Sequence, residues 1–225
     1  MNIYYDGANI NELSEVLELG IISGVTTNLT FSKQAMKKEN VSYEELQNQF
    51  FKKIKSYKEK KLSLSFQVTQ NKPELIYDEA VRIYDKYCDV DLKIKIPLNY
   101  ENFKVIDKLV RKGVKINATC VTSYMQALSA LNAGCSYISF FWGRMTDEDI
   151  DAASIVMSFR NLLDRNSMSD KAKILVGSIR QPQVISEAFK AGSDIVTIQY
   201  PNFKKMLNQL KSTESNDIFQ KDWKE

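Results

Sequence analysis

Eight short apolar segments, separated by longer amphipathic stretches, run from one end of the 225-residue chain to the other. The expected strands are residues 2–6, 21–26, 62–68, 91–96, 114–118, 137–141, 173–176 and 195–198. The intervening stretches with helical spacing of apolar residues include 43–59, 73–87 and 147–164. This alternation favours a parallel sheet, and eight repeats in a chain of this size favour a closed (β/α)8 TIM barrel over an open doubly wound sheet.

The barrel is expected to form one domain over residues 1–212, because no linker or low-complexity tract interrupts the alternation. Two of the predicted helices close with glycine before a new strand, in Asn132-Ala-Gly-Cys-Ser and Lys190-Ala-Gly-Ser-Asp. Residues 213–225 differ in character, with Ile218, Phe219 and Trp223 at helical spacing. We expect a short C-terminal helical arm there, whose apolar stripe needs a surface to pack on.

The absence of histidine excludes Ser-His-Asp and Cys-His catalysis and the commonest zinc sites. Cys88, Cys120 and Cys135 lack C-x-x-C spacing and are expected to be reduced thiols. A net charge of +3 is too small to indicate binding to nucleic acid or to an acidic membrane. The sequence shows no pattern of a signal peptide or a transmembrane segment, so we expect a cytoplasmic protein. We expect no nucleic acid and no membrane among its partners.

Polar residues occur at most of the expected C-terminal strand ends, which is where a barrel of this type places its catalytic groups. In chain order they are Asp6, residues 26–28, Gln67, Lys95, and residues 117–119, 139–144 and 178–180. A purely structural barrel would not require them, so these strand ends are candidate site residues.

The segment Lys93-Ile94-Lys95-Ile96-Pro97 is the most informative strand, because it places two lysines on one face. Burial lowers the pKa of a lysine, and the neutral amine is a nucleophile for carbonyls. The alternative is an edge strand with solvated lysines. Lys95 is nearer the C-terminal mouth and is expected to react. A charged Lys93, one layer deeper, would depress the pKa of Lys95.

Several motifs together resemble the transaldolase family, in particular its small branch of short transaldolases and fructose-6-phosphate aldolases. They are Gly24-Val25-Thr26-Thr27-Asn28, Lys95-Ile96-Pro97, residues 126–134, Gly143-Arg144 and Ser178-Ile179-Arg180. They occur in order, and the similarity extends from Asp6 to Trp223, which is nearly the whole chain. The resemblance implies the (β/α)8 fold and a class I, lysine-imine mechanism in carbohydrate metabolism such as the pentose phosphate pathway.

The resemblance also implies a role for each candidate residue. Lys95 would form an imine with a ketose carbonyl, and Asp6 would act as acid and base on the substrate hydroxyl. The catalytic water would be held by Gln67 and Thr119. The sugar-binding residues would be Thr26, Asn28, Asn117, Ser139 and Phe141, and the phosphate-binding residues Arg144, Ser178 and Arg180. No metal and no organic cofactor is implied, since the lysine imine is itself the electron sink.

These residues also have purely structural alternatives. Asp6 or Ser178 could cap the helix that follows it, Asn28 or Asn117 could be a turn residue, and Arg144 could be a surface charge. Two positions depart from the family pattern, with Leu29 and Phe140 where the family usually has proline. These departures concern loop shape and acceptor specificity more than the core chemistry.

The features that separate the two branches of the family conflict. Phe141, Asn117 and Arg180 resemble the transaldolases, whereas Gln67 resembles the aldolases. We therefore expect transfer of a dihydroxyacetone unit from a ketose phosphate, of the fructose 6-phosphate type, to an aldose phosphate. The alternatives are a fructose-6-phosphate aldolase-like lyase that releases dihydroxyacetone and a non-catalytic sugar-phosphate-binding barrel. The resemblance further implies a homo-oligomer, a pentamer or decamer.

Overall fold

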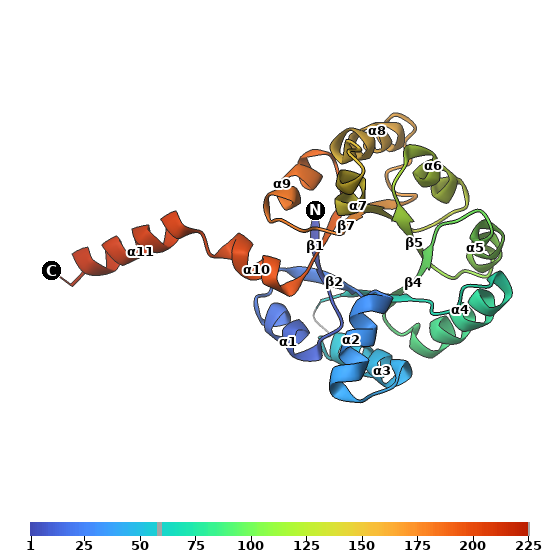
Figure 1. The fold of residues 1–225 in the computed structure, drawn as a ribbon, viewed down its shortest axis with the longest axis horizontal. Helices are drawn as coiled ribbons and strands as arrows, with labels where there is room; N and C mark the ends of the chain where they lie inside the picture. Colours follow the sequence, from blue (N-terminus) through green and yellow to red (C-terminus); the bar gives the residue numbers. More distant parts are fainter. Residues whose placement is uncertain (58–59, 225) are drawn as a thin grey trace.

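The computed structural model describes residues 1–57 and 60–224, which form a closed barrel of parallel strands surrounded by helices (Figure 1). The strands are β1 (Asn2–Asp6), β2 (Ile22–Thr26), β3 (Ser63–Gln67), β4 (Asp91–Pro97), β5 (Ile116–Val121), β6 (Tyr137–Phe141), β7 (Lys173–Gly177) and β8 (Ile195–Ile198). Each strand pairs in parallel with the next, and β8 pairs with β1. The predicted (β/α)8 barrel is confirmed.

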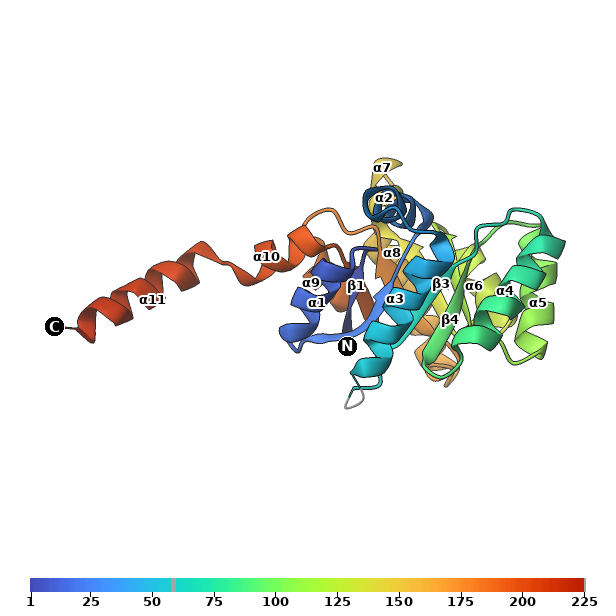
Figure 2. The same ribbon diagram turned by 90° about the horizontal axis from the view of Figure 1, so that it is seen from below.

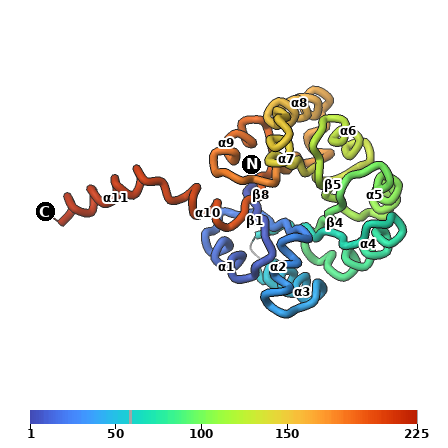
Figure 3. Tube along the Cα trace, in the orientation of Figure 1, coloured from blue at the N-terminus to red at the C-terminus, as the bar shows by residue number. Residues whose placement is uncertain are grey.

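Most of the helices lie around the outside of the barrel (Figures 1 and 3). The helices are α1 (Ile10–Glu18), α2 (Leu29–Glu39), α3 (Tyr43–Ser56), α4 (Pro73–Tyr87), α5 (Asn102–Arg111), α6 (Tyr124–Asn132), α7 (Trp142–Asp147), α8 (Ala152–Arg165), α9 (Gln183–Lys190), α10 (Tyr200–Leu207) and α11 (Leu210–Asp222). Figure 2 shows α2 and α7 at one end of the barrel, while α11 extends away from it. None of the helices in the described residues is long and apolar enough to span a membrane.

Two predicted elements differ from the observed ones. The helix expected over 147–164 is instead α8, preceded by the separate short helix α7, because Asp149 has a left-handed φ of 54° and Asp151 caps α8. The fifth strand was expected over 114–118 but runs from Ile116 to Val121. Its pairing with β6 is irregular after Ala118, where Cys120 has a φ of 65°. The helix expected over 43–59 ends at Ser56, and residues 58–59 lie outside the described part.

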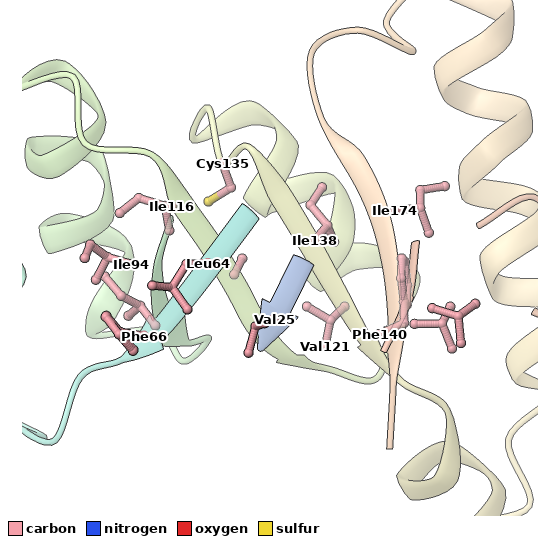
Figure 4. Packing of buried hydrophobic residues seen from close by; sticks show 14 of the residues in the cluster. Val25, Leu64, Phe66, Ile94, Ile116, Val121, Cys135, Ile138, Phe140 and Ile174 are labelled. Carbon is pink, nitrogen blue, oxygen red and sulfur yellow. The ribbon is translucent and has the colours of Figure 1, made fainter. Parts of the chain in front are cut away.

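The main core lies between the strands and the helices, because alternate residues of each strand point outward. Figure 4 shows this layer, which includes Leu64, Ile94, Ile116, Ile138 and Ile174, one residue from each of five consecutive strands. Burial of these side chains against the helices is the main favourable contribution to barrel stability.

The other residues of each strand point into the barrel and fill its interior. A small apolar cluster of Tyr4, Tyr137, Leu175 and Ile195 occupies part of this space. The Tyr4 and Tyr137 hydroxyls are 2.9 Å apart. Gly24 makes room for Tyr4, since a Cβ there would lie 2.6 Å from the ring. This packed layer fills the part of the interior below the site. The polar side chains of the site lie nearer the C-terminal ends of the strands.

Candidate active site

Lys95 lies inside the barrel on β4, and its buried side chain points into the interior. Strand register sets Gln67 of β3 and Asn117 of β5 directly beside it. The Lys95 Nζ donates a hydrogen bond to the backbone carbonyl of Thr27 at 2.9 Å. Burial is the main cause that lowers the pKa of Lys95, while the charges of Asp6 and Cys120 act in the opposite direction. A larger neutral fraction of the amine is therefore available near pH 7.

Asp6 ends β1 and is also buried. The Thr26 hydroxyl donates to Asp6 Oδ1 at 3.1 Å, and it lies 2.6 Å from the Thr197 hydroxyl. Burial raises the pKa of the Asp6 carboxyl above its ordinary value, although the charge of Lys95 and the hydrogen bond from Thr26 lower it. A carboxyl with a raised pKa next to a lysine with a lowered pKa is a pair suited to acid–base chemistry.

Asn117 and Ser139 belong to a second buried hydrogen-bond network. The Ser139 hydroxyl donates to Asn117 Oδ1 at 2.6 Å, and Asn117 Nδ2 donates to the Ser65 hydroxyl at 3.2 Å. These bonds link β3, β5 and β6 across the interior and fix the amide orientation. Asn117 is therefore a member of a polar network rather than a turn residue.

The Thr119 hydroxyl is completely buried, and no described residue offers it a hydrogen bond of normal geometry. The thiol of Cys120, a weak acceptor, is a polar group nearby. Buried hydroxyls are normally paired, so this group is suited to a bound water. On the opposite side of Lys95, Tyr43 fixes the backbone of Gln67 by donating to its carbonyl oxygen at 2.7 Å.

A cavity of about 340 Å³ opens over these residues at the C-terminal end of the barrel. The predicted residues that line it are Asp6, Thr26, Asn28, Gln67, Lys95, Ser139, Phe141, Arg144 and Ser178. Asn117, Thr119 and Arg180 are not among its lining residues: the first two are completely buried, and Arg180 is exposed and pairs with Asp147. The structure therefore brings most of the predicted site together around one cavity.

The arginine side of the cavity depends on a close approach between α7 and the segment after β7. Gly143 N donates to the carbonyl of Ser178 at 3.2 Å, and a Cβ on Gly143 would lie only 2.4 Å from that oxygen. Ser178 itself has a left-handed φ of 60°. Both arginines contact Asp147: Arg180 through both of its terminal nitrogens, and Arg144 with Nη1 at 3.8 Å from Oδ2.

The structural alternatives for the site residues have different outcomes. Asn9, not Asp6, caps α1, and the cap position of α9 is Pro182, so neither Asp6 nor Ser178 has the capping role. Asn28 does cap α2, by accepting from Phe31 N at 3.0 Å, and it also lines the cavity.

Lys93 does not have the neighbours that its hypothesis required. It forms an ion pair with Asp91, donates to the Ser63 hydroxyl at 3.1 Å, and lies 4.5 Å from the centre of the Tyr137 ring. The charge of Lys93 is therefore compensated by Asp91, which lies on the same strand and farther from its C-terminal end than Lys95. Burial is the main cause of the lowered pKa of Lys95, and Lys93 is not among its causes, so the structure gives the Lys93 hypothesis no support.

Sequence reasoning missed four polar residues that line the cavity: Thr30, Cys120, Thr197 and Gln199. Thr197 lies on β8, and Gln199 follows directly after that strand. The end of the eighth strand is the one strand end that was not predicted to belong to the site. Alternation along residues 195–198 would have placed Thr197 inward. Cys120 lies within the irregular part of β5, between Ala118 and Val121, which no local pattern indicates.

A model of the family described as transaldolase/fructose-6-phosphate aldolase matches residues 3–225. A probable transaldolase of Thermoplasma volcanium is 32% identical over 225 residues, covering 100% of this chain and 96% of the relative. A probable transaldolase of Petrotoga mobilis is 33% identical over 224 residues, covering 100% and 95%. Among solved structures, a cube-shaped, highly porous cage designed by fusing symmetric oligomeric domains has a TM-score of 0.56 at 14% identity, covering 99% of this chain and 76% of that one. This last likeness shows the fold alone.

Proposed function

The chain belongs to the transaldolase/fructose-6-phosphate aldolase family, and we propose that it transfers a dihydroxyacetone unit from a ketose phosphate to an aldose phosphate. The donor is of the fructose 6-phosphate type. The observation that supports the chemistry most directly is the pair of buried groups, Lys95 and Asp6, on one cavity. Their pKa values shift toward neutrality from opposite sides.

In the proposed reaction the neutral amine of Lys95 attacks the ketone carbon, and loss of water gives the imine. Asp6 removes the proton from the hydroxyl beside the carbon–carbon bond that breaks. The bonding electrons move into the imine, which leaves an enamine on Lys95 and a free aldose phosphate. The enamine then attacks the acceptor carbonyl, Asp6 returns the proton to the new alkoxide, and water hydrolyses the imine.

The remaining residues bind the substrate and the water in this proposal. Thr26, Asn28 and Ser139 contact the sugar hydroxyls, with Phe141 beside them and Asn117 holding Ser139 in place. Gln67 and Thr119 hold the water; the supporting observation is the buried hydroxyl of Thr119, which has only the weak acceptor thiol of Cys120 nearby. Arg144, Ser178 and Arg180 bind the phosphate at the rim, where guanidinium groups suit a phosphate and its oxygens.

Borohydride reduction in the presence of fructose 6-phosphate tests the imine. The expected result is a single added mass of the dihydroxyacetone fragment or of the intact sugar phosphate, located on Lys95 by peptide mapping. Lys95→Met should abolish the adduct, while Lys108→Met, a helix-surface change, should retain it. An adduct on Lys93, or none at all, would contradict the proposal.

Cleavage without transfer is the second candidate, because Gln67 beside Lys95 resembles the aldolase branch. Adding erythrose 4-phosphate separates the two reactions. A transferase forms the seven-carbon ketose phosphate and releases little dihydroxyacetone when the acceptor is withheld. Efficient release of dihydroxyacetone without an acceptor would assign the chain to the cleaving enzymes. A non-catalytic sugar-phosphate-binding barrel, the further alternative, would bind the sugar phosphate but give no adduct.

A further inference from the structure

Asp147 is the one acidic side chain described in contact with both arginines of the proposed phosphate site. It ends α7, and its two carboxylate oxygens accept from Arg180 Nη1 and Nη2, one each. Arg144 Nη1 lies 3.8 Å from Asp147 Oδ2. The Arg180 guanidinium holds the pKa of the Asp147 carboxyl below its usual range, so Asp147 is an anion at neutral pH.

The pairing with Asp147 occupies the part of Arg180 that a phosphate would use. Arginine recognises carboxylate and phosphate with the same two parallel hydrogen bonds. The Arg180 Nε is turned toward Gly143, where a Cβ would lie 3.1 Å from it. Arg180 is also absent from the cavity lining, although Arg144 and Ser178 belong to it. Arg180 is thus directed to the carboxylate of Asp147 rather than to the cavity.

The contact of Asp147 with the two arginines is exposed enough for a phosphate to replace the carboxylate. The side chains of Arg144, Arg180 and Asp147 are 68%, 52% and 35% exposed, respectively. Ion pairs at such exposure contribute little to stability, because water solvates the separated charges nearly as well. The two arginines and Asp147 carry a combined charge of +1, from +2 and −1, toward an incoming phosphate dianion.

We propose that Asp147 is a resident counter-anion of the phosphate site, which the substrate phosphate displaces from Arg180. Asp147 thereby weakens the binding of phosphorylated sugars relative to unphosphorylated ones and determines this part of the specificity. The inference rests on the proposed function, because it takes Arg144, Ser178 and Arg180 as the phosphate site.

The test compares Asp147→Asn with Glu148→Gln, which makes the same change of net charge at the neighbouring exposed residue. Inorganic phosphate binding is measured by calorimetry, and the KM is measured for fructose 6-phosphate and for unphosphorylated dihydroxyacetone. Removing one negative charge a few ångströms from the phosphate should lower the phosphate Kd and the KM for fructose 6-phosphate about 5- to 10-fold. The KM for dihydroxyacetone should stay within about 2-fold, as should all values for Glu148→Gln.

A rise in the phosphate Kd of Asp147→Asn would overturn the proposal, because it would make Asp147 a positioning residue for Arg180. Unchanged binding would overturn it as well. Failure of the underlying function is recognised separately. Wild-type protein that forms no borohydride adduct with dihydroxyacetone lacks the imine chemistry, and wild-type protein that binds no inorganic phosphate lacks the phosphate site itself.

Discussion

Asp6 and Lys95 are buried ionisable residues whose charges act on each other. The Asp6 carboxylate raises the pKa of Lys95, while burial lowers it. Both groups must lose a proton before the reaction begins, Lys95 to attack the ketone and Asp6 to accept the hydroxyl proton. Activity is therefore expected to fall on the acid side, and at a higher pH than an ordinary carboxylate would give, since the pKa of Asp6 is raised.

Asp6→Asn should separate the acid–base role of Asp6 from the effect of its charge on the pKa of Lys95. Loss of the acid–base group is expected to reduce kcat/KM for transfer by about 10²- to 10⁴-fold. Imine formation should persist, and its pH midpoint should move to lower pH, because the carboxylate that raises the pKa of Lys95 is gone. The rate of borohydride trapping as a function of pH measures this shift. Asp170→Asn, at an exposed turn, serves as the control, and an identical midpoint in the Asp6 variant would contradict the assigned coupling.

Phe141→Tyr tests the choice between transfer and cleavage. Phe141 lines the same cavity as Gln67 and Lys95 but has no hydroxyl. The tyrosine adds a donor and acceptor that can hold the water near the enamine, and a positioned acid contributes about 10²- to 10⁴-fold. The variant should gain release of dihydroxyacetone from fructose 6-phosphate and lose transfer to erythrose 4-phosphate.

Phe141→Leu provides the matched control, because it changes the shape of the ring site without adding a hydroxyl. If the wild type already cleaves efficiently without an acceptor and the tyrosine changes nothing, Gln67 identifies the branch correctly. The preference for transfer would then be wrong.

At the scale of elements, the start of α2 explains why leucine can replace the family's proline at position 29. Leu29 is the first helical residue, where a backbone N–H has no partner within the helix. The preceding Asn28 has φ −143° and ψ 165°, the extended conformation that a residue before proline adopts. The backbone therefore already accepts proline here.

Leu29→Pro is expected to raise the free energy of unfolding by about 0.4–1 kcal/mol, because proline restricts the unfolded chain. Urea denaturation measures the change. Ser32→Pro is the contrasting variant, since it removes the bond from Ser32 N to the carbonyl of Asn28 and should destabilise the protein. A destabilised Leu29→Pro would mean that the leucine side chain contributes more at the cavity edge than the backbone gains.

For the whole molecule, α11 is the helix that projects away from the barrel (Figures 1 and 2), and none of its described residues is buried. Phe219 and Trp223 are 68% and 87% exposed. Exposed aromatic side chains grouped on one helix are typical of an interaction surface. We propose that α11 packs on another copy of the chain in a homo-oligomer, a pentamer or decamer.

Light scattering at micromolar concentration should give a mass several times 25.9 kDa. The double variant Phe219→Ser and Trp223→Ser removes the aromatic pair and should shift the population toward the monomer. Lys211→Ser, on the same helix but without an aromatic ring, should leave the mass unchanged. A monomeric wild type would refute the assembly.

The fold class and nine of the residues that line the cavity could be predicted from sequence patterns and the family resemblance. Alternating apolar segments are a local pattern, and they were sufficient for eight strands and for the barrel that closes them. Once the barrel is assumed, its geometry places every C-terminal strand end around one mouth, so Asp6 and Lys95 could be brought together without coordinates.

Which charges and hydroxyls meet depends on contacts between segments that are far apart in the chain. Thr197 joins Thr26 and Asp6 because β8 closes on β1. The contact of Asp147 with Arg180 spans 33 positions of the chain. Such contacts depend on strand register and on the packing of short helices, which are set by interactions between distant segments and leave no periodic pattern in the sequence.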